Sequence, residues 1–247
     1  MGSKNSNIEK TLIIIPAYNE EERILNVISR CRKYLSEKVD LIVVNDGSTD
    51  RTLTVCEDAG VNIISVPFNH GVGNALKTGF LYALKNNYEN VITIDADGQH
   101  DPDDLPKFIQ KLEAKQFDIV IGSRFMNGKK YDGSIVRITG NKFFAWVVSV
   151  LIREKLTDVT SGFRGMNRAV LNYSVDDLFN FDYPDADFLL TLHRAGFHFC
   201  EIQVKMNKRI GGESQHRGFK PIYYIFKMLL SIFIILMRKK NIKNHRR

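Results

Sequence analysis

Short, mostly apolar segments alternate with longer helical patterns through the first half of the chain, and this alternation limits the possible folds more than any other feature. Such short apolar runs are typical of strands that are covered on both faces. The predicted strands are Thr11–Ile15, Leu41–Val44, Asn62–Val66, Val91–Ile94 and Asp118–Ile121, and the predicted helices between them are Glu20–Tyr34, Asp50–Ala59, Gly73–Lys85 and Asp103–Ala114. We therefore expect an α/β fold with a mostly parallel, Rossmann-like sheet and helices on both faces.

Polar residues follow four of the five predicted strands, at the point where each strand ends. They are Pro16, Tyr18 and Glu20 after the first strand, Asp46 after the second, Asp95, Asp97 and Gln99 after the fourth, and Arg124 after the fifth. In a parallel sheet these ends lie at one edge, where folds of this class bind their ligands. One polar strand end would be an ordinary loop, but four at the same edge indicate a binding site.

Asp95 and Asp97 stand one residue apart at the end of the strand Val91–Ile94. Both carboxylates can reach one hard cation, because Mg²⁺ and Mn²⁺ prefer oxygen ligands and keep positions open for phosphate oxygens. The amide oxygen of Gln99 could add a neutral ligand. A metal here would neutralise the diphosphate that leaves a nucleotide-sugar. The alternative is a pair of loop acids that cap the next helix, although two later acids stand closer to that helix.

Two further positions could contact a nucleotide. Asp46 is a lone acid after the second strand, which suits a ribose hydroxyl or the edge of a base, but it could instead form an Asx-turn with Gly47. The segment Gly71–Thr78 is close to a phosphate-binding loop, yet Leu76 stands where that loop needs glycine. We interpret this segment as the start of a helix, on which Lys77 either faces the donor or lies in solvent.

Composition limits the domain count and the compartment. The chain has 247 residues, 44% of them hydrophobic, which is enough for one sizeable core. The three cysteines, Cys31, Cys56 and Cys200, are odd in number and scattered, which predicts buried thiols in a reducing compartment and neither disulfides nor a zinc site. Residues 1–10 are polar and contain no secretory signal, so we expect a cytoplasmic location.

The C-terminal segment combines an apolar stretch with a basic tail. Pro221–Met237 is largely apolar but contains Lys227, and residues 238–247 contain six Lys or Arg and no acid. The net charge is +7, so the chain without those six has a charge of only +1. A basic tail alone could bind RNA, DNA or anionic lipid. The adjacent apolar stretch favours lipid, and the absence of aromatic residues in the tail argues against nucleic acid.

Pro221–Met237 is about as long as the shortest membrane spans, but it is interrupted by a lysine. We therefore expect an apolar helix that lies in the membrane interface and is held by the basic tail, with Phe143–Ile152 beside it. This divides the chain into a main domain, 1–220, and a membrane-associating part, 221–247. The alternative is that both helices pack on the body or on a partner subunit.

Six motifs, in their order along the chain, resemble family 2 glycosyltransferases. They are Ile15–Glu20 (IPAYNE), Val44–Asp50 (VNDGSTD), Asn69–Ala75 (NHGVGNA), Asp95–His100 (DADGQH), Asp158–Arg164 (DVTSGFR) and Arg209–Ser214 (RIGGES). The last two look like the dolichol- or polyprenyl-phosphate glycosyltransferase branch. The resemblance implies a GT-A fold, inversion at the anomeric carbon of the sugar, and a lipid-phosphate acceptor.

The resemblance also implies roles for individual residues. Donor binding would fall to Pro16, Tyr18, Glu20, Asp46 and Asp95, binding of Mg²⁺ or Mn²⁺ to Asp95, Asp97 and Gln99, and phosphate binding to Arg124, Arg209 and Ser214. Arginine suits this last role because its guanidinium offers a planar fork of donors to phosphate oxygens. Asp97 and Arg209 would then act directly in catalysis.

The second half is less regular, and it predicts a helix at Asp185–Ala195 and a strand at Phe199–Val204. Family members often carry a glutamate in this helix, where Asp187 stands here. If the acceptor is a hydroxyl, this carboxylate would be its general base. If the acceptor is a phosphate, it is already ionised and needs no base. Asp185 could alternatively cap the helix.

The expected reaction moves a hexosyl unit from a UDP- or GDP-sugar to a polyprenyl phosphate at the cytoplasmic face of a membrane. The alternative is transfer to a hydroxyl group of a polysaccharide or glycolipid. The sequence leaves open whether the enzyme works as a homo-oligomer or with a membrane partner protein.

Overall fold

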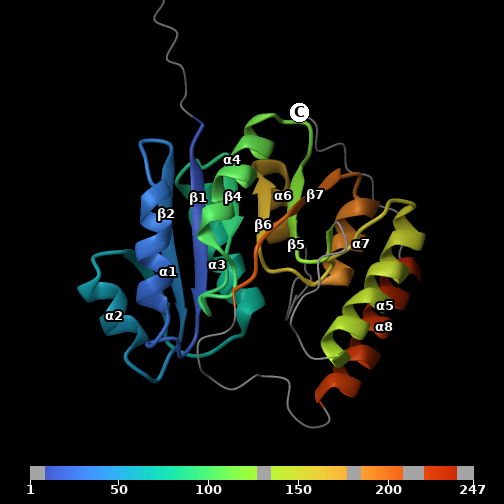
Figure 1. Cartoon of the computed structure of the whole chain (residues 1–247), viewed down its shortest axis with the longest axis horizontal. Helices are drawn as coiled ribbons and strands as arrows, with labels where there is room; N and C mark the ends of the chain where they lie inside the picture. Colours follow the sequence, from blue (N-terminus) through green and yellow to red (C-terminus); the bar gives the residue numbers. More distant parts are fainter. Residues whose placement is uncertain (1–8, 127–134, 177–184, 208–219, 238–247) are drawn as a thin grey trace, which may run out of the picture.

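The computed structural model describes residues 9–126, 135–176, 185–207 and 220–237. These residues form a seven-stranded sheet with helices on both faces (Figure 1). The strands are β1 (Thr11–Ala17), β2 (Val39–Asp46), β3 (Asn62–Val66), β4 (Asn90–Thr93), β5 (Ile119–Ser123), β6 (Arg164–Asn167) and β7 (Phe199–Gln203). Their order across the sheet is β3-β2-β1-β4-β6-β5-β7.

Neighbouring strands are parallel except at β6, which lies antiparallel between β4 and β5. Because β6 is reversed relative to both neighbours, β5 runs in the same direction as β4. The carboxyl ends of β1, β2, β4 and β5 therefore lie at one edge of the sheet. This confirms the mostly parallel α/β sheet and the shared edge that the sequence predicts.

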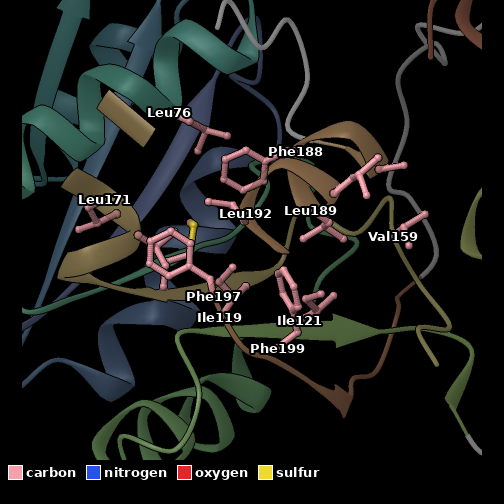
Figure 2. Packing of buried hydrophobic residues seen from close by; sticks show 14 of the residues in the cluster. Leu76, Ile119, Ile121, Val159, Leu171, Phe188, Leu189, Leu192, Phe197 and Phe199 are labelled. Carbon is pink, nitrogen blue, oxygen red and sulfur yellow. The ribbon is translucent and has the colours of Figure 1, made fainter. Parts of the chain in front are cut away.

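The helices pack on the sheet through two apolar clusters, one on each face. They are α1 (Ile24–Cys31), α2 (Thr52–Asp58), α3 (Val72–Lys85), α4 (Leu105–Glu113), α5 (Ile135–Ile152), α6 (Arg168–Asp176), α7 (Ala186–Arg194) and α8 (Lys220–Met237). Residues of α1, α2 and α4 belong to one cluster, and residues of α3, α5, α6, α7 and α8 to the other. Figure 2 shows part of the second cluster, in which Phe188 and Leu192 of α7 gather with Ile119 and Ile121 of β5.

The sequence patterns did not predict β6 or α6. The four residues of β6 (RGMN) have neither the length nor the apolar content of a predicted strand. They become a strand through pairing, with Gly165 lying between Ile92 of β4 and Val120 of β5. Tertiary contacts therefore override a weak local preference here.

Several predicted helices begin later than expected, among them those predicted from Glu20 and Asp103. The helix predicted from Glu20 starts at Ile24, because the carbonyl of Glu20 accepts hydrogen bonds from the amides of Arg23 and Ile24 in a preceding turn. The helix predicted from Asp103 is preceded by a short 3₁₀ turn, Pro102–Asp104, and the Asp101 side chain accepts from the Asp103 amide at the start of that turn.

The three cysteines are free, as predicted, although only Cys31 and Cys56 are buried and Cys200 is half-buried. Burial raises the pKa of the Cys31 thiol to about 12 and that of Cys56 to about 11. Thiols that remain protonated at neutral pH are poor nucleophiles. The described cysteines therefore belong to the packing of the fold.

Helix α8 uses one side to pack on the body and leaves the other side exposed. Met228, Ile232 and Ile235 belong to the same core cluster as α7, whereas Phe226 and Phe233 are 64% and 59% exposed. Figure 1 shows α5 and α8 at the opposite end of the molecule from α2. Among the residues described, no helix is both long and apolar enough to cross a bilayer.

Candidate active site

The loops that follow β1 and β2 are joined by side chains from the first two motifs. Asn19, which has a positive φ of 54°, accepts a hydrogen bond on Oδ1 from the amide of Thr49 at 2.8 Å. The backbone amide of Asn19 donates to Ser48 Oγ at 3.0 Å. The carboxylate of Asp50 accepts from the amide of Glu21 at 3.2 Å. These contacts make the two loops one hydrogen-bonded unit at the edge of the sheet.

Three of the predicted donor residues lie on or beside this unit. Pro16 is near the end of β1, where it pairs with Val44 of β2. Tyr18 is partly exposed, so its ring can still meet a ligand. Glu20 is half-buried, and its Oε2 accepts from Arg23 Nε at 2.5 Å.

Asp46 is buried at the end of β2, and its carboxylate binds the loop that leads into α3. Oδ1 accepts from the amide of His70 at 3.0 Å, and Oδ2 accepts from the amide of Gly71 at 2.8 Å. Two amide donors stabilise the ionised carboxylate and fix its orientation. Asp46 thus determines where the loop before α3 lies, a structural role that the sequence did not predict.

The turn after β2 is formed by neighbours of Asp46. Asn45 Oδ1 accepts from the amide of Ser48 at 3.2 Å, so the asparagine makes the side-chain bond across this turn. Gly47 has a φ of 65°, and a Cβ there would lie 2.4 Å from the backbone carbonyl carbon of Phe68. Only glycine combines this backbone conformation with such a close approach of two loops.

Lys77 lies in the second turn of α3 and is half-buried. Its neighbours Leu76 and Phe80 belong to the core, so the helix presents Lys77 beside its buried face. The structure therefore confirms that the segment is a helix start, while the role of Lys77 in donor binding stays a prediction.

Asp95 follows β4 and lies between two groups that limit its orientation. Its side chain is 41% exposed, and Oδ2 lies 3.0 Å from Nε2 of His100. On the other side is Gly162, where a Cβ would lie 2.7 Å from Asp95 Oδ1 and 2.9 Å from Oδ2. The absence of a side chain at Gly162 therefore creates the space that the carboxylate fills.

Asp97 lies on the same loop, half-buried, and its Oδ1 accepts from the amide of Gln99 at 3.0 Å. Within the described part of the chain, no group of three or more His, Cys, Asp and Glu side chains could hold a metal ion by itself. Mg²⁺-type sites commonly use one or two carboxylates together with substrate phosphates. The oxygen donors of Asp95, Asp97 and Gln99 fit a cation that is shared with the diphosphate of a donor.

Arg124 follows β5, and its guanidinium is buried in an ion pair instead of facing solvent. Its Nε and Nη2 donate to the two carboxylate oxygens of Asp158, both at 2.6 Å, and Nη2 also donates to Thr160 Oγ1 at 2.7 Å. The Arg124 amide donates to the same carboxylate at 3.0 Å. Arg124 thus holds the segment 157–163, and a phosphate could bind to it only in addition to these contacts.

The segment 157–163 is held from two more sides. The carboxylate of Glu201 accepts from the amides of Thr157 and Asp158 at 2.8–2.9 Å, and burial raises the pKa of Glu201. Thr93 Oγ1 donates to the carbonyl of Gly162 at 2.7 Å. These bonds place Gly162 against Asp95, so a buried polar network supports one wall of the candidate metal site.

Asp187 lies in the first turn of α7 and contacts α8. Its Oδ2 accepts from Ser231 Oγ at 2.7 Å, and burial raises its pKa while the nearby Arg164 opposes that rise. Asp185 stands at the N-cap position, but its side chain makes no capping hydrogen bond. The Asp187–Ser231 bond ties the C-terminal helix to the body, and sequence patterns did not predict it.

Arg209 and Ser214 lie outside the described residues. The chain just before them is placed: Met206 forms an antiparallel bridge with His100, and the amide of Asn207 donates to the carbonyl of Gln99 at 2.7 Å. The chain at Met206 and Asn207 therefore lies beside the loop that carries Asp95 and Asp97.

Three contributors to this site were not singled out from the sequence: His100, Asp158 and Gly162. All three stand inside the motifs DADGQH and DVTSGFR, so the motifs themselves were the available signal. Their contacts join residues that are far apart in sequence, such as Asp158 with Arg124 and Gly162 with Asp95. Local patterns cannot identify such pairs.

Comparison with known proteins places the chain in a family. The profile of glycosyl transferase family 2 matches residues 12–174. The chain belongs to this family. It is 30% identical over 220 residues to the undecaprenyl-phosphate mannosyltransferase of Micrococcus luteus, covering 85% of this chain and 88% of that protein. It is 32% identical over 240 residues to the UDP-N-acetylglucosamine–dolichyl-phosphate N-acetylglucosaminyltransferase of Methanococcus voltae, covering 88% and 94%.

A solved structure supports the fold. The glucosyl-3-phosphoglycerate synthase of Mycobacterium tuberculosis, in complex with Mn²⁺ and UDP-glucose, superposes with a TM-score of 0.70 at 20% identity, covering 92% of this family 2 chain and 78% of the synthase. The expected GT-A fold is confirmed, and so is the resemblance to the dolichol- or polyprenyl-phosphate branch.

Proposed function

We propose that this family 2 glycosyltransferase moves a hexosyl unit from a UDP- or GDP-sugar to a polyprenyl phosphate, in a metal-dependent reaction that inverts the anomeric carbon. The observation that carries the proposal is the position of Asp95 and Asp97, two partly exposed carboxylates on one loop at the carboxyl edge of the sheet. The names of the relatives from Micrococcus luteus and Methanococcus voltae support a polyprenyl-type phosphate as the acceptor.

The joined loops after β1 and β2 suit the nucleotide of the donor. Tyr18 offers an exposed ring, and Pro16 and Glu20 lie beside it on the same loop. Asp46 shapes the neighbouring loop through its two amide contacts, which positions the start of α3 and Lys77 at this edge. We assign these residues to the donor side of the site.

Asp95, Asp97 and Gln99 would hold Mg²⁺ or Mn²⁺. The bound cation supplies charge to the diphosphate that leaves when the bond from the anomeric carbon to the phosphate oxygen breaks. The chain limits the orientation of the Asp95 carboxylate at Gly162, where a Cβ would lie 2.7 Å from Oδ1. Preorganised charge of this kind is effective because it needs no rearrangement during the reaction.

We assign the acceptor phosphate to Arg209 and Ser214, which follow the segment bound to Gln99. Arg124 has a different role in this proposal. Its Nε and Nη2 donate to Asp158 and Thr160, so we assign it to positioning the wall that contains Gly162, and a phosphate would bind in addition to these contacts.

A phosphate acceptor agrees with the surroundings of Asp187. An ionised phosphate oxygen attacks the anomeric carbon without losing a proton, so no general base is needed. Asp187 already accepts a hydrogen bond from Ser231, and burial raises its pKa, which makes the ionised carboxylate less favourable. Transfer to a hydroxyl would need this carboxylate ionised and open to the acceptor.

We propose that the enzyme binds the cytoplasmic face of a membrane through residues 221–247 and the exposed side of α5, while 1–220 form the catalytic domain. Trp146 and Val150 on α5 are 64% and 59% exposed, and α8 exposes Phe226 and Phe233. Each basic residue near an anionic leaflet contributes about 1 kcal/mol, so the six of the tail would add to this apolar contact. Such a location brings the site to a lipid acceptor.

The test uses the full chain with Mn²⁺ and a panel of UDP- and GDP-sugars. The acceptors are a short polyprenyl phosphate and the matching polyprenol, which differ only in the phosphate. We expect transfer to the phosphate, loss of that transfer in excess EDTA, and loss in Asp97→Asn. Activity that persists in EDTA would exclude the metal role, and transfer to the polyprenol alone would favour the hydroxyl-acceptor alternative.

A further inference from the structure

His100 is a nearly fully buried polar side chain beside the candidate metal site, and no step of the proposed reaction uses it. Its side chain is 3% exposed, and Nε2 lies 3.0 Å from Asp95 Oδ2. Its other ring nitrogen, Nδ1, is buried and has no hydrogen-bond partner among the described residues. A buried polar atom without a partner costs about 1–3 kcal/mol, so packing alone is a poor reason for a histidine here.

The contact with Asp95 determines which nitrogen of the neutral ring carries the proton. A carboxylate oxygen only accepts hydrogen bonds, so Nε2 must be the donor and Nδ1 the unpaired acceptor. The opposite tautomer would place two acceptors 3.0 Å apart. The ring is therefore in place to donate to Asp95 and to nothing else that the structure describes.

The surroundings of His100 hold its ring in one position. Its centroid lies 5.2 Å from that of Phe163, which in turn stacks on Phe108 at 4.2 Å. Its backbone forms an antiparallel bridge with Met206. A donor that is fixed by packing and by backbone pairing can impose an orientation on the more exposed carboxylate of Asp95.

The burial of its ring also argues against His100 as a metal ligand. The ring is 3% exposed, and its only described polar contact is with Asp95. The Asp95 side chain is 41% exposed, so it is the group of this pair that a cation can reach. Gly162 limits the same carboxylate from its other side, since a Cβ there would lie 2.7 Å from Asp95 Oδ1 and 2.9 Å from Oδ2.

We propose that His100 is a positioning residue for the metal ligand Asp95: the hydrogen bond from Nε2 to Oδ2 holds the carboxylate in the orientation in which it meets the cation. The proposal rests on the metal-dependent function proposed above. Hydrogen-bond partners of metal ligands commonly change metal affinity about 10–100-fold when they are removed. The same loss is expected here, without a change in the ligands themselves.

The experiment measures Mn²⁺ binding directly, by the electron paramagnetic resonance signal of free Mn²⁺, in the full chain with saturating UDP or GDP. His100→Leu and His100→Asn should weaken Mn²⁺ binding about 10–100-fold, because neither can donate to Asp95 from the position of Nε2. His100→Gln should remain within a few-fold of the wild type, because its amide nitrogen can take that position. The Asn and Gln pair compares two polar variants if the Leu variant does not fold.

His198→Leu is the matched control. His198 also lies beside an aspartate, with its Nδ1 3.5 Å from Asp118 Oδ2. Asp118 directly precedes β5 and His198 directly precedes β7, so the pair lies at the opposite edge of the sheet from Asp95. Its loss should leave Mn²⁺ binding unchanged.

Two results would overturn the inference in different ways. If the wild type binds Mn²⁺, Asp97→Asn does not, and both His100→Leu and His100→Asn bind it as tightly as the wild type, then His100 has only a packing role and the proposed function stands. A wild type that binds no Mn²⁺ in the presence of either nucleotide would overturn the metal-dependent function and this inference with it.

Discussion

Replacing Gly162 by alanine should separate the geometry of the candidate metal site from the stability of the fold. A Cβ at this position would lie 2.7 Å from Asp95 Oδ1, whereas ordinary contact begins near 3.4 Å, so the carboxylate must retreat by the difference, about 0.7 Å. Misplacing a reacting or binding group by about 1 Å can lower a rate about 100-fold. We therefore expect kcat/KM to fall about 10- to 100-fold, which corresponds to about 1.4–2.7 kcal/mol.

The same substitution should cost little stability. The Asp95 side chain is 41% exposed and can turn away from a new methyl group without displacing the core. The free energy of unfolding should change by less than about 1 kcal/mol, as for substitutions that leave the core intact. The assay is steady-state transfer at saturating Mn²⁺, with urea unfolding measured on the same preparations.

Gly165→Ala, in the adjacent strand β6, is the matched control. Its Cβ would lie 3.0 Å from Leu112 Cδ1 and 3.3 Å from Phe108 Cδ1, both in the core. Overpacking of this kind costs about 1–3 kcal/mol of stability. Gly165→Ala should therefore lose stability and keep most of its activity, the reverse of Gly162→Ala. Wild-type activity in Gly162→Ala, or activity losses that simply follow stability in both variants, would refute the reasoning.

Three further predictions concern the supporting contacts. Arg124→Ala should lower the free energy of unfolding by about 3–5 kcal/mol in urea, because it leaves the buried carboxylate of Asp158 unpaired; lost donor binding at unchanged stability would favour direct phosphate contact instead. Ile232→Ala should lower the free energy of unfolding by about 2–5 kcal/mol. Phe233→Ala, at a neighbouring exposed position, should change it by no more than about 0.5 kcal/mol. Phe233→Ala should instead weaken co-sedimentation with anionic vesicles. Burial raises the pKa of Asp187 above that of the unfolded chain, so its ionisation costs stability as the pH rises through the folded-state pKa. Asp187→Asn should therefore become more stable than the wild type as the pH rises above about 4, and the two should converge in acid. A difference in the free energy of unfolding that does not depend on pH would contradict this.

The first half of the fold follows from local patterns because each strand there is a short apolar run ended by polar residues. The strand Asn62–Val66 has its predicted bounds, and the strand Thr11–Ala17 extends two residues beyond the predicted end at Ile15. The carboxyl edge could be located for the same reason, since parallel strands bring their ends together whatever their order. Asp46 and the Asp95 loop were therefore found where they were expected.

Other features depend on partners that no local pattern contains. Arg164–Asn167 is a strand only because β4 and β5 lie on either side of it. Arg124 looks like a phosphate ligand at a strand end, yet Asp158, 34 positions later, takes its guanidinium. Ser231 lies in an apolar helix that resembles an appendage, but its hydroxyl binds Asp187 and ties the helix to the body.

The amino-acid sequence was enough to predict the class of fold, the edge of the sheet where the polar strand ends gather, and the two carboxylates proposed to hold a metal. Each of these depends on neighbours within one strand and its loop. The orientation of those carboxylates was decided by packing. Asp95 is confined by His100, five positions later, and by Gly162, whose distance in sequence gives no sign of contact. A motif can identify the residues of a site, but the positions of their atoms depend on contacts between segments that are distant in sequence.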